Sequence, residues 1–280
     1  MMDNFYKKFA INIFRKAGVE VNGSKDSDIQ VKNEKFYKKV IFGGSLAFGE
    51  TYMAGFWDCE RIDKLVALLL KSKLDNKYKG IFLLGKVFLA TFFNQQNLKK
   101  AKKNIERHYD IGNDLYSLML DKRMVYSCGY WQKANNLDEA QEAKLDLICR
   151  KLKLKKGMSI LDIGCGWGSF AKFVAEKYGC QVTGVTLSAE QARYAQNNCS
   201  HLPVKILKDD YRKVKGKFDR VVSIGMFEHV EPKNYKQYFK KVYSLLTEDG
   251  ISLLHTIGTN KQKQMTEPFI EKYIFPGGVL

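Results

Sequence analysis

The sequence predicts an α/β protein in which a mostly parallel sheet follows a smaller, helix-rich α+β domain. From residue 138 onward, short apolar runs alternate with amphipathic segments of helical period, a pattern typical of parallel sheets joined by crossover helices. The first apolar run ends in three alternating glycines, within the residues 160–168 that read Ile-Leu-Asp-Ile-Gly-Cys-Gly-Trp-Gly. Such glycines let the backbone turn sharply beside a ligand at the carboxyl end of a strand.

Helices and strands alternate along this second part of the chain. The expected strands are residues 158–163, 181–186, 204–208, 218–224 and 251–256. The expected helices are residues 138–152, 169–178, 189–199 and 234–246. Asp138 is placed to cap the first helix or to favour its first turn, and Ser188 is placed to cap the third. Because helices join the strands, we expect a parallel sheet with right-handed crossovers.

Residues 1–95 form the predicted smaller domain. They combine a strand-like run at 39–42 with helices at 61–73 and 78–93, whose apolar faces are interleaved with lysines. A basic amphipathic helix can lie on a membrane surface, although such a stripe is more often packed core. Residues 96–137 are expected to be a linker followed by a segment that covers the site. The sheet-containing domain is expected to occupy residues 138–280.

Composition and charge limit the class of protein. The chain has 280 residues, 45% of them hydrophobic, and only four prolines, which argues against a disordered protein. Its six cysteines contain no C-x-x-C pair, so neither a zinc site nor a disulfide framework is expected, and the thiols suit a reducing cytosol. No signal peptide is visible, and the longest apolar stretch, 81–93, is too short to span a bilayer.

The formal net charge of +17 favours an anionic partner, either nucleic acid or an acidic membrane surface. The excess is uneven, because residues 1–107 hold 21 Lys and Arg against 11 Asp and Glu. A solvated lysine-rich face explains the same charge equally well.

Each predicted strand end carries residues that suit a nucleotide cofactor or catalysis. The glycine spacing of 164–168 resembles motif I of S-adenosylmethionine (SAM) methyltransferases rather than a dehydrogenase fingerprint. Thr186 and Gln191 offer a hydroxyl and an amide where most SAM enzymes place an acidic residue for the ribose. Residues 208–211, Lys-Asp-Asp-Tyr, offer a carboxylate and an aromatic face for adenine. Taken singly, each of these has a structural alternative as a cap or a turn.

Further polar and aromatic residues occur near the same edge. The fourth strand is followed by Glu228 and His229, and the fifth ends at His255. Residues 126–131, Tyr-Ser-Cys-Gly-Tyr-Trp, supply aromatic faces and a thiol before the sheet begins. A lone buried histidine or cysteine is more often structural than catalytic.

Together these segments resemble the cyclopropane-fatty-acyl-phospholipid synthase family. The resemblance runs from about Lys39 to the last residue, through ten phrases in order: 44–58, 108–116, 124–131, 161–168, 184–191, 210–212, 218–220, 225–235, 254–258 and 272–280. The related mycolic acid cyclopropane synthases share the catalytic phrases but lack the first ninety or so residues of this chain. The resemblance implies a class I SAM-dependent methyltransferase domain with a Rossmann-like sheet.

The implied reaction is methyl transfer from SAM to a cis double bond of an unsaturated phospholipid acyl chain. It gives a cyclopropane ring and S-adenosylhomocysteine (SAH), through a carbocation that bound bicarbonate deprotonates. The resemblance assigns catalysis to Glu228, His255 and Cys128, and bicarbonate binding to these three with the backbone of Ile257. It assigns no metal. The implied SAM-binding residues are Tyr126, Ser127, Gly164, Gly166, Thr186, Leu187, Gln191, Asp210 and Tyr211. The implied substrate-pocket residues are His108, Tyr130, Trp131 and Phe227, with Tyr126 as a further aromatic candidate.

Two departures from the family pattern are visible. The chain stops at residues 277–280, where the family normally continues for roughly another hundred residues, the scale of a small domain. The methyltransferase domain is therefore expected to be C-terminally incomplete and to lack a tyrosine of the bicarbonate site. Ala47 and Phe48 also interrupt a glycine-rich phrase of the N-terminal part.

We expect the chain to be cytoplasmic and peripherally associated with the inner face of the cell membrane. The expected partners are an anionic phospholipid surface and an unsaturated phospholipid, without nucleic acid, and a homodimer is left open. The alternatives are a truncated SAM- and lipid-binding remnant with little activity and a fatty-acyl methyltransferase that makes branched chains. A basic RNA methyltransferase explains the charge but not Glu228 with His255 and the aromatic segment.

Overall fold

The computed structural model describes residues 2–72, 113–258 and 267–274. Contacts divide the chain into two compact units, one of residues 1–93 with 266–274 and one of residues 94–265 with 275–280. The predicted helix at 78–93, the part of the predicted linker and cover segment 96–137 up to residue 112, and the candidate His108 lie outside the described residues. Residues 267–274, which were expected in the sheet-containing domain, are grouped by their contacts with the first unit.

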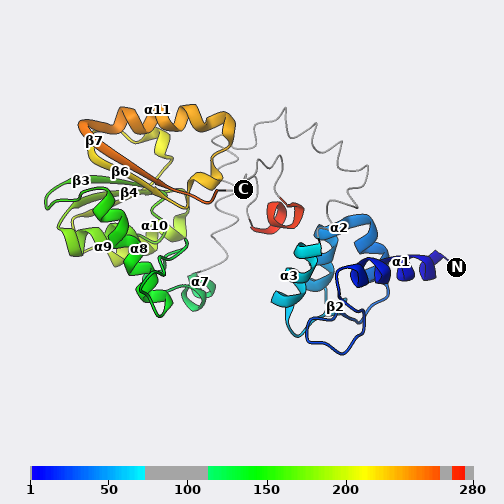
Figure 1. Cartoon of the computed structure of the whole chain (residues 1–280). Helices are drawn as coiled ribbons and strands as arrows, with labels where there is room; N and C mark the ends of the chain where they lie inside the picture. The colour runs from blue at the N-terminus through cyan, green and yellow to red at the C-terminus, as the bar shows by residue number, and fades with distance from the viewer. Residues whose placement is uncertain (1, 73–112, 259–266, 275–280) are drawn as a thin grey trace. The chain divides into compact units, whose positions relative to one another are not determined.

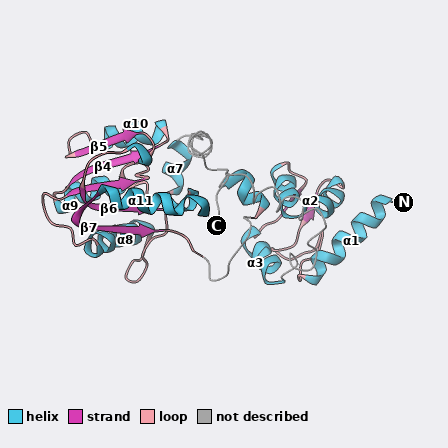
Figure 2. Cartoon of the chain, turned by 90° about the horizontal axis from the view of Figure 1, so that it is seen from above, coloured by secondary structure: helices cyan, strands magenta, loops and turns pink. Residues whose placement is uncertain are grey.

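The second unit is built on a five-stranded sheet. Its strands are β3 (Ser159–Ile163), β4 (Gln181–Thr186), β5 (Val204–Lys208), β6 (Phe218–Ile224) and β7 (Leu246–His255). They lie in the order β5-β4-β3-β6-β7, and every neighbouring pair is parallel (Figure 2). The chain runs outward from β3 to β5 and then crosses to β6 on the other side of β3. This reversal makes the carboxyl ends of β3 and β6 the place where a crevice is expected.

Helices cover both faces of this sheet (Figure 1). They are α8 (Leu137–Lys151), α9 (Ser169–Tyr178), α10 (Ala189–Asn198) and α11 (Tyr235–Leu245). The short helix α7 (Asn113–Met119) instead packs through Tyr116 against Trp167 of the loop after β3. Side chains of β3 alternate between the two faces, as the pleat requires. Ile160 packs in the cluster formed with α8 and α9, whereas Leu161 and Ile163 pack in the cluster that contains α11.

The sheet was predicted closely. Strands 181–186, 204–208 and 218–224 agree with the structure at both ends, and β3 begins one residue later than predicted. The last strand begins at Leu246 rather than at residue 251, with a register irregularity between Phe218 and Arg220 of its partner β6. Ser188 caps α10 as predicted, since its side chain accepts from the Gln191 N–H. The cap of α8 is Asn136 and not Asp138, which lies in the first turn.

The first unit contains α1 (Met2–Lys16), α2 (Lys35–Met53), α3 (Ile62–Ser72) and a two-stranded antiparallel sheet of β1 (Gln30–Val31) and β2 (Trp57–Asp58). A short π-helical turn at Ile270–Ile274 belongs to the same unit. The prediction of a strand at 39–42 is wrong, because these residues lie inside α2. Phe36, Tyr37, Val40 and Ile41 face one core at helical spacing, and the strand-like run is a part of that longer pattern.

No helix among the described residues combines the length and the apolar character needed to cross a bilayer.

Candidate active site

The glycine loop after β3 has the backbone conformation that only glycine adopts easily. Gly164, Gly166 and Gly168 have φ angles of 82°, 54° and 83°. A Cβ at Gly164 would lie 2.6 Å from the Met226 Cβ, so the loop packs against the segment that follows β6. A Cβ at Gly166 would meet nothing within 4 Å. The loop is therefore closed by protein at Gly164 and open at Gly166, where a ligand can approach the backbone.

One cavity lies beside this loop. The nine residues that the sequence assigns to SAM binding all line it: Tyr126, Ser127, Gly164, Gly166, Thr186, Leu187, Gln191, Asp210 and Tyr211. They come from the ends of β3, β4 and β5 and from the segment before α8. Parallel strands bring their carboxyl ends to one edge, which explains why residues so far apart in the sequence meet here.

Two polar pairs organise the cavity wall beyond β4 and β5. The Thr186 hydroxyl donates to Gln191 Oε1 at 2.8 Å, and both side chains are buried. The Asp210 carboxylate accepts two bonds from the Arg212 guanidinium, at 2.8 and 2.7 Å, in a bidentate pair. Burial raises the pKa of the neighbouring Tyr211 to about 12, so its hydroxyl stays protonated. This wall therefore presents hydrogen-bonding groups whose positions are fixed by other side chains.

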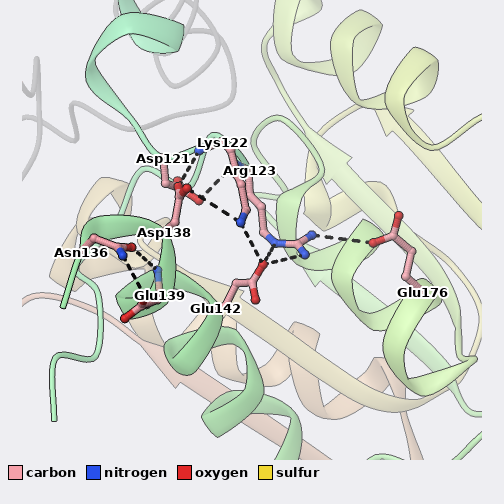
Figure 3. A network of polar contacts seen from close by, with 8 residues as sticks. All are labelled: Asp121, Lys122, Arg123, Asn136, Asp138, Glu139, Glu142 and Glu176. Carbon is pink, nitrogen blue, oxygen red and sulfur yellow. Dashed lines mark hydrogen bonds and ion pairs between the residues drawn. The ribbon is translucent and has the colours of Figure 1, made fainter. Parts of the chain in front are cut away.

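The segment before α8 is anchored to two helices by a network of charges (Figure 3). Arg123 donates to Glu142 of α8 at 2.9 Å and lies 3.7 Å from Glu176 of α9. The Lys122 N–H donates to Asp138 at 3.0 Å. Exposed ion pairs contribute little singly, but the Arg123 side chain is largely buried and is shared between two helices. The network therefore fixes the position of this segment relative to α8 and α9.

Asp121 holds the turn that leads from this network into the cavity. Its buried carboxylate accepts from the backbone N–H of Val125 at 2.7 Å and of Arg123 at 3.1 Å. Between them, Met124 has a φ of 60°, a conformation that costs a non-glycine residue about 1–3 kcal/mol. The Ser169 hydroxyl of α9 donates to the Arg123 and Met124 carbonyls. These bonds offset the strain and aim Tyr126, Ser127 and Cys128 from one short segment.

The four residues assigned to bicarbonate also lie together. The Ile257 N–H donates to Glu228 Oε1 at 2.8 Å, and Cys128 Sγ lies 3.5 Å from His255 Nε2. The Gly225 N–H donates to the His255 carbonyl at 3.0 Å, which joins the ends of β6 and β7. Glu228 is only 6% exposed. The Ile257 amide is therefore bonded to Glu228 itself, an arrangement that the sequence does not reveal.

Two polar atoms of this cluster are buried without a partner. Among the described residues, Glu228 Oε2 and His255 Nδ1 form no hydrogen bond. Burial lowers the pKa of His255 below its usual value of 6.5, and the nearby Lys144 charge lowers it further, against an opposing effect of Glu228. The imidazole is thus neutral near pH 7 and carries one N–H. An unsatisfied acceptor and an unsatisfied ring nitrogen suit a small ligand that both donates and accepts.

Sequence reasoning missed two polar residues on α8. Lys144 is buried in the cavity wall and donates to the Ser127 hydroxyl at 2.7 Å. Gln141, one turn earlier, donates to the Ser127 carbonyl at 2.7 Å. Both lie on the stripe of α8 that also carries the buried Leu145 and Ile148. A lysine and a glutamine at core-facing positions of an amphipathic helix are the signal that could have identified them.

The candidates for the substrate pocket are more scattered. Tyr130 and Trp131 are exposed, the latter by 53%, and neither lines the cavity. Phe227 is buried in the core, where its ring stacks on Tyr235 with centroids 4.6 Å apart. Tyr126 lines the cavity, and its ring meets Tyr116 edge-on at 5.4 Å. No metal-binding group of His, Cys, Asp or Glu occurs among the residues that the structure describes.

Comparisons with known proteins agree with this geometry. The family model described as mycolic acid cyclopropane synthetase matches residues 96–280. The cyclopropane-fatty-acyl-phospholipid synthase of Escherichia coli (strain K12) is 50% identical over 279 residues, which are 99% of this chain and 73% of that protein.

Two solved structures are similar in fold and sequence. The cyclopropane synthase MmaA2 from Mycobacterium tuberculosis is 35% identical with a TM-score of 0.60, over 63% of this chain and 68% of that one. The mycolic acid cyclopropane synthase CmaA1, complexed with SAH and CTAB, is 37% identical with a TM-score of 0.60, over 64% of this chain and 69% of that one.

Proposed function

This chain belongs to the mycolic acid cyclopropane synthetase family and is a SAM-dependent cyclopropane fatty acid synthase, and we propose that it acts on the cis double bonds of unsaturated phospholipid acyl chains. The proposal rests above all on one observation. Glu228 follows β6, His255 ends β7, and Cys128 comes directly after Ser127, which is one of the nine candidate SAM-binding residues that all line one cavity. Bound SAM supplies an electrophilic methyl group at this edge of the sheet.

The residues around the cavity fit SAM. Gly166 leaves open space where a ligand can lie against the backbone. Thr186 and Gln191 offer polar groups at the end of β4, where ribose hydroxyls are expected. Asp210 and Tyr211 offer a carboxylate and an aromatic face for adenine at the end of β5. Tyr126 and Ser127 line the same cavity from the anchored segment.

An alkene is a weak nucleophile, and its methylation gives a reactive carbocation that the pocket must protect. The double bond attacks the methyl carbon as the sulfur–carbon bond breaks, which leaves a carbocation on the acyl chain. A proton then leaves the added carbon, and its bonding electrons close the ring. Aromatic faces stabilise a cation, and among the aromatic residues predicted to line the substrate pocket Tyr126 is the one that lines the cavity. Exclusion of water prevents capture of the cation as an alcohol.

The chain's residues also fit a bicarbonate ion, which would accept this proton. Glu228 Oε2 and His255 Nδ1 are buried and have no hydrogen-bond partner among the described residues. A ligand with one O–H and one anionic oxygen can bond to both atoms. When the Cys128 thiol donates to Nε2, the proton of the neutral imidazole lies on Nδ1 and is available to an anion. Glu228 would accept the ligand's hydrogen and pass on the proton, while its bond to Ile257 keeps the carboxylate in place.

The first unit carries features that suit the surface of an anionic membrane. Phe5, Tyr6, Phe9 and Phe42 form a run of ring contacts with centroids 5.6–6.1 Å apart, and Phe5 and Phe42 are 63% and 68% exposed. A groove beside this aromatic patch is lined by three lysines and one acid, Lys35, Lys38, Lys39 and Glu34. Aromatic rings with lysines beside them favour the interface of an acidic bilayer. These features support the proposal that the chain is a peripheral protein at the inner face of the cell membrane.

The activity is tested with purified protein, SAM labelled in its methyl group and anionic vesicles of unsaturated phospholipid. The expected product is labelled phospholipid whose fatty acid is heavier by one methylene group and lacks the double bond. Vesicles of saturated phospholipid provide the control and should stay unlabelled. A labelled branched chain would indicate the alternative, a fatty-acyl methyltransferase that makes branched chains. In a parallel assay with added RNA, label in RNA with none in lipid would refute the proposal.

Membrane association is tested by co-sedimentation with vesicles. Binding should require anionic lipid and weaken with added salt, since screening reduces surface attraction. The double variant Phe5→Ser/Phe42→Ser should bind less, whereas Tyr243→Ser, which removes an exposed ring from the second unit, should bind normally. Equal binding by both variants would exclude the aromatic patch as the contact.

A further inference from the structure

Lys144 is a buried cation in the wall of the cavity. Its side chain projects from α8, is only 4% exposed and lines the same space as Gly164 and Gly166. Its ammonium has three donors, and the bond that the structure gives it is the one to the Ser127 hydroxyl. Asp121 and Asp162 act on it as nearby charges, without an ion pair among the described residues. A buried charge without a bonded counterion is costly unless a ligand provides one.

The bond between Lys144 and Ser127 fixes the direction of the hydroxyl proton. An ammonium cannot accept a hydrogen bond, so the Ser127 oxygen must be the acceptor in this contact. The hydroxyl proton is then free to be donated elsewhere. Gln141 holds the carbonyl of the same residue at 2.7 Å, which limits how far the hydroxyl can move. Two donors, one of them charged, thus lie in one wall of the cavity.

The geometry points to a specific ligand group: we propose that Lys144 and the Ser127 hydroxyl bind the α-carboxylate of the methionine part of SAM. This inference rests on the proposed assignment of the cavity to SAM. Ser127, with which Lys144 is bonded, and the glycine loop line the cavity, whereas Glu228, His255 and Cys128 of the bicarbonate cluster do not. The carboxylate is the one anionic group of SAM. It would supply the counterion that the protein does not provide.

The charge state of Lys144 agrees with this role. Burial lowers its pKa to about 8, partly offset by Cys128, Asp121 and Asp162. The side chain is therefore mostly an ammonium near neutral pH and becomes neutral in mildly alkaline solution. Because a carboxylate favours the charged form, binding should be strongest below this pKa and weaken above it.

The test compares two ligands that differ only in the carboxylate. Calorimetry measures binding of SAH and of its decarboxylated analogue, S-adenosyl-3-thiopropylamine, to the whole chain. Lys144→Met should lose about ten- to a hundredfold in affinity for SAH, the loss expected for a charged hydrogen bond, and almost none for the analogue. Lys144→Arg should recover part of the loss. Lys151→Met, which removes an exposed lysine of the same helix, is the matched control and should bind both ligands normally.

The pH dependence provides a second measurement that needs no variant. In the wild-type protein, the ratio of SAH affinity to analogue affinity should fall above pH about 8, because the amino group common to both ligands cancels. Equal losses for both ligands in Lys144→Met, or a ratio independent of pH, would assign Lys144 a structural role and overturn the inference. Unchanged SAH binding with reduced turnover would overturn it too and place Lys144 in the proton step. Binding of neither ligand by the wild-type protein would instead refute the assignment of the cavity to SAM.

Discussion

Substitution of Gly166 by alanine separates the stability of the glycine loop from its role in binding. Gly166 has a φ of 54°, and an added Cβ would meet nothing within 4 Å. The substitution therefore costs only the left-handed backbone, about 1–2 kcal/mol. At about 2–4 °C per kcal/mol for a unit of this size, the melting temperature should fall by roughly 2–8 °C. The new methyl group would project into the space assigned to SAM and should weaken SAH binding about five- to a hundredfold, the cost of overpacking by one methyl group.

Two further glycines provide matched comparisons. Gly157 also has a positive φ, 84°, and open space at its Cβ, but it precedes β3 and does not line the cavity. Gly157→Ala should lower the melting temperature similarly and leave SAH affinity unchanged. Gly164→Ala should be the least stable, because its Cβ would lie 2.6 Å from that of Met226 and overpacking adds about 1–3 kcal/mol.

The measurements are thermal unfolding without ligand and calorimetric titration with SAH for each variant. Normal SAH affinity in Gly166→Ala would mean that the open space at this glycine is not where the cofactor lies. Equal stability of Gly164→Ala and Gly166→Ala would contradict the packing of the loop on the segment that carries Glu228.

Three other results are expected. Glu228→Gln should lower turnover by about 10²–10⁴-fold with SAH affinity nearly unchanged, because the amide keeps an acceptor oxygen but cannot relay a proton. The control is Glu231→Gln, which changes another buried acid of the same loop. A parallel loss of SAH binding in Glu228→Gln would refute the relay. Burial lowers the pKa of His255, so the unfolded chain binds the proton more readily, and the free energy of unfolding should rise with pH up to about 6.5. Urea titrations at several pH values should show a flatter rise for His255→Asn than for the wild-type protein. Identical slopes for the two proteins would contradict the lowered pKa of His255. Asp121→Asn should lower the free energy of unfolding by about 1–3 kcal/mol, because it loses one of two acceptors for backbone N–H groups, and unchanged denaturation would exclude this role.

The sheet was predictable because its signals are local. Each strand is a short apolar run bounded by polar or glycine-containing turns, and Ser188 predicts the start of α10 because an N-cap directly precedes its helix. The strand prediction at 39–42 was wrong because this apolar run is both strand-like and part of a longer helical pattern. Only the packing of α2 on a core with Trp57 and Leu65 decides between the two, and that packing is not a local property.

The composition of the site was predictable, but its connections were not. Motif phrases identified nine of the residues that line the cavity, because such phrases are contiguous in sequence. The bonds from Lys144 to Ser127 and from Ile257 to Glu228 join residues 17 and 29 positions apart. No spacing rule connects those pairs, because each contact depends on how α8 or β7 packs on its neighbours. The sequence did not predict Lys144 as a residue of the site, because a lysine in a charged helix is usually exposed.

The buried charges together explain how the site can attract anions near neutral pH. Burial lowers the pKa of His255, so a histidine cation is not available there. Burial also raises the pKa of Asp162 to about 7, which reduces the negative charge next to the glycine loop. Lys144, with a pKa of about 8, is a buried cation of the cavity wall that is mostly charged at neutral pH. An anion site built on His255 alone would lose its charge as pH rises through the lowered pKa of this histidine, whereas one supported by Lys144 keeps its charge up to about pH 8. The neutral imidazole therefore remains free to donate a hydrogen bond without being the source of the attraction.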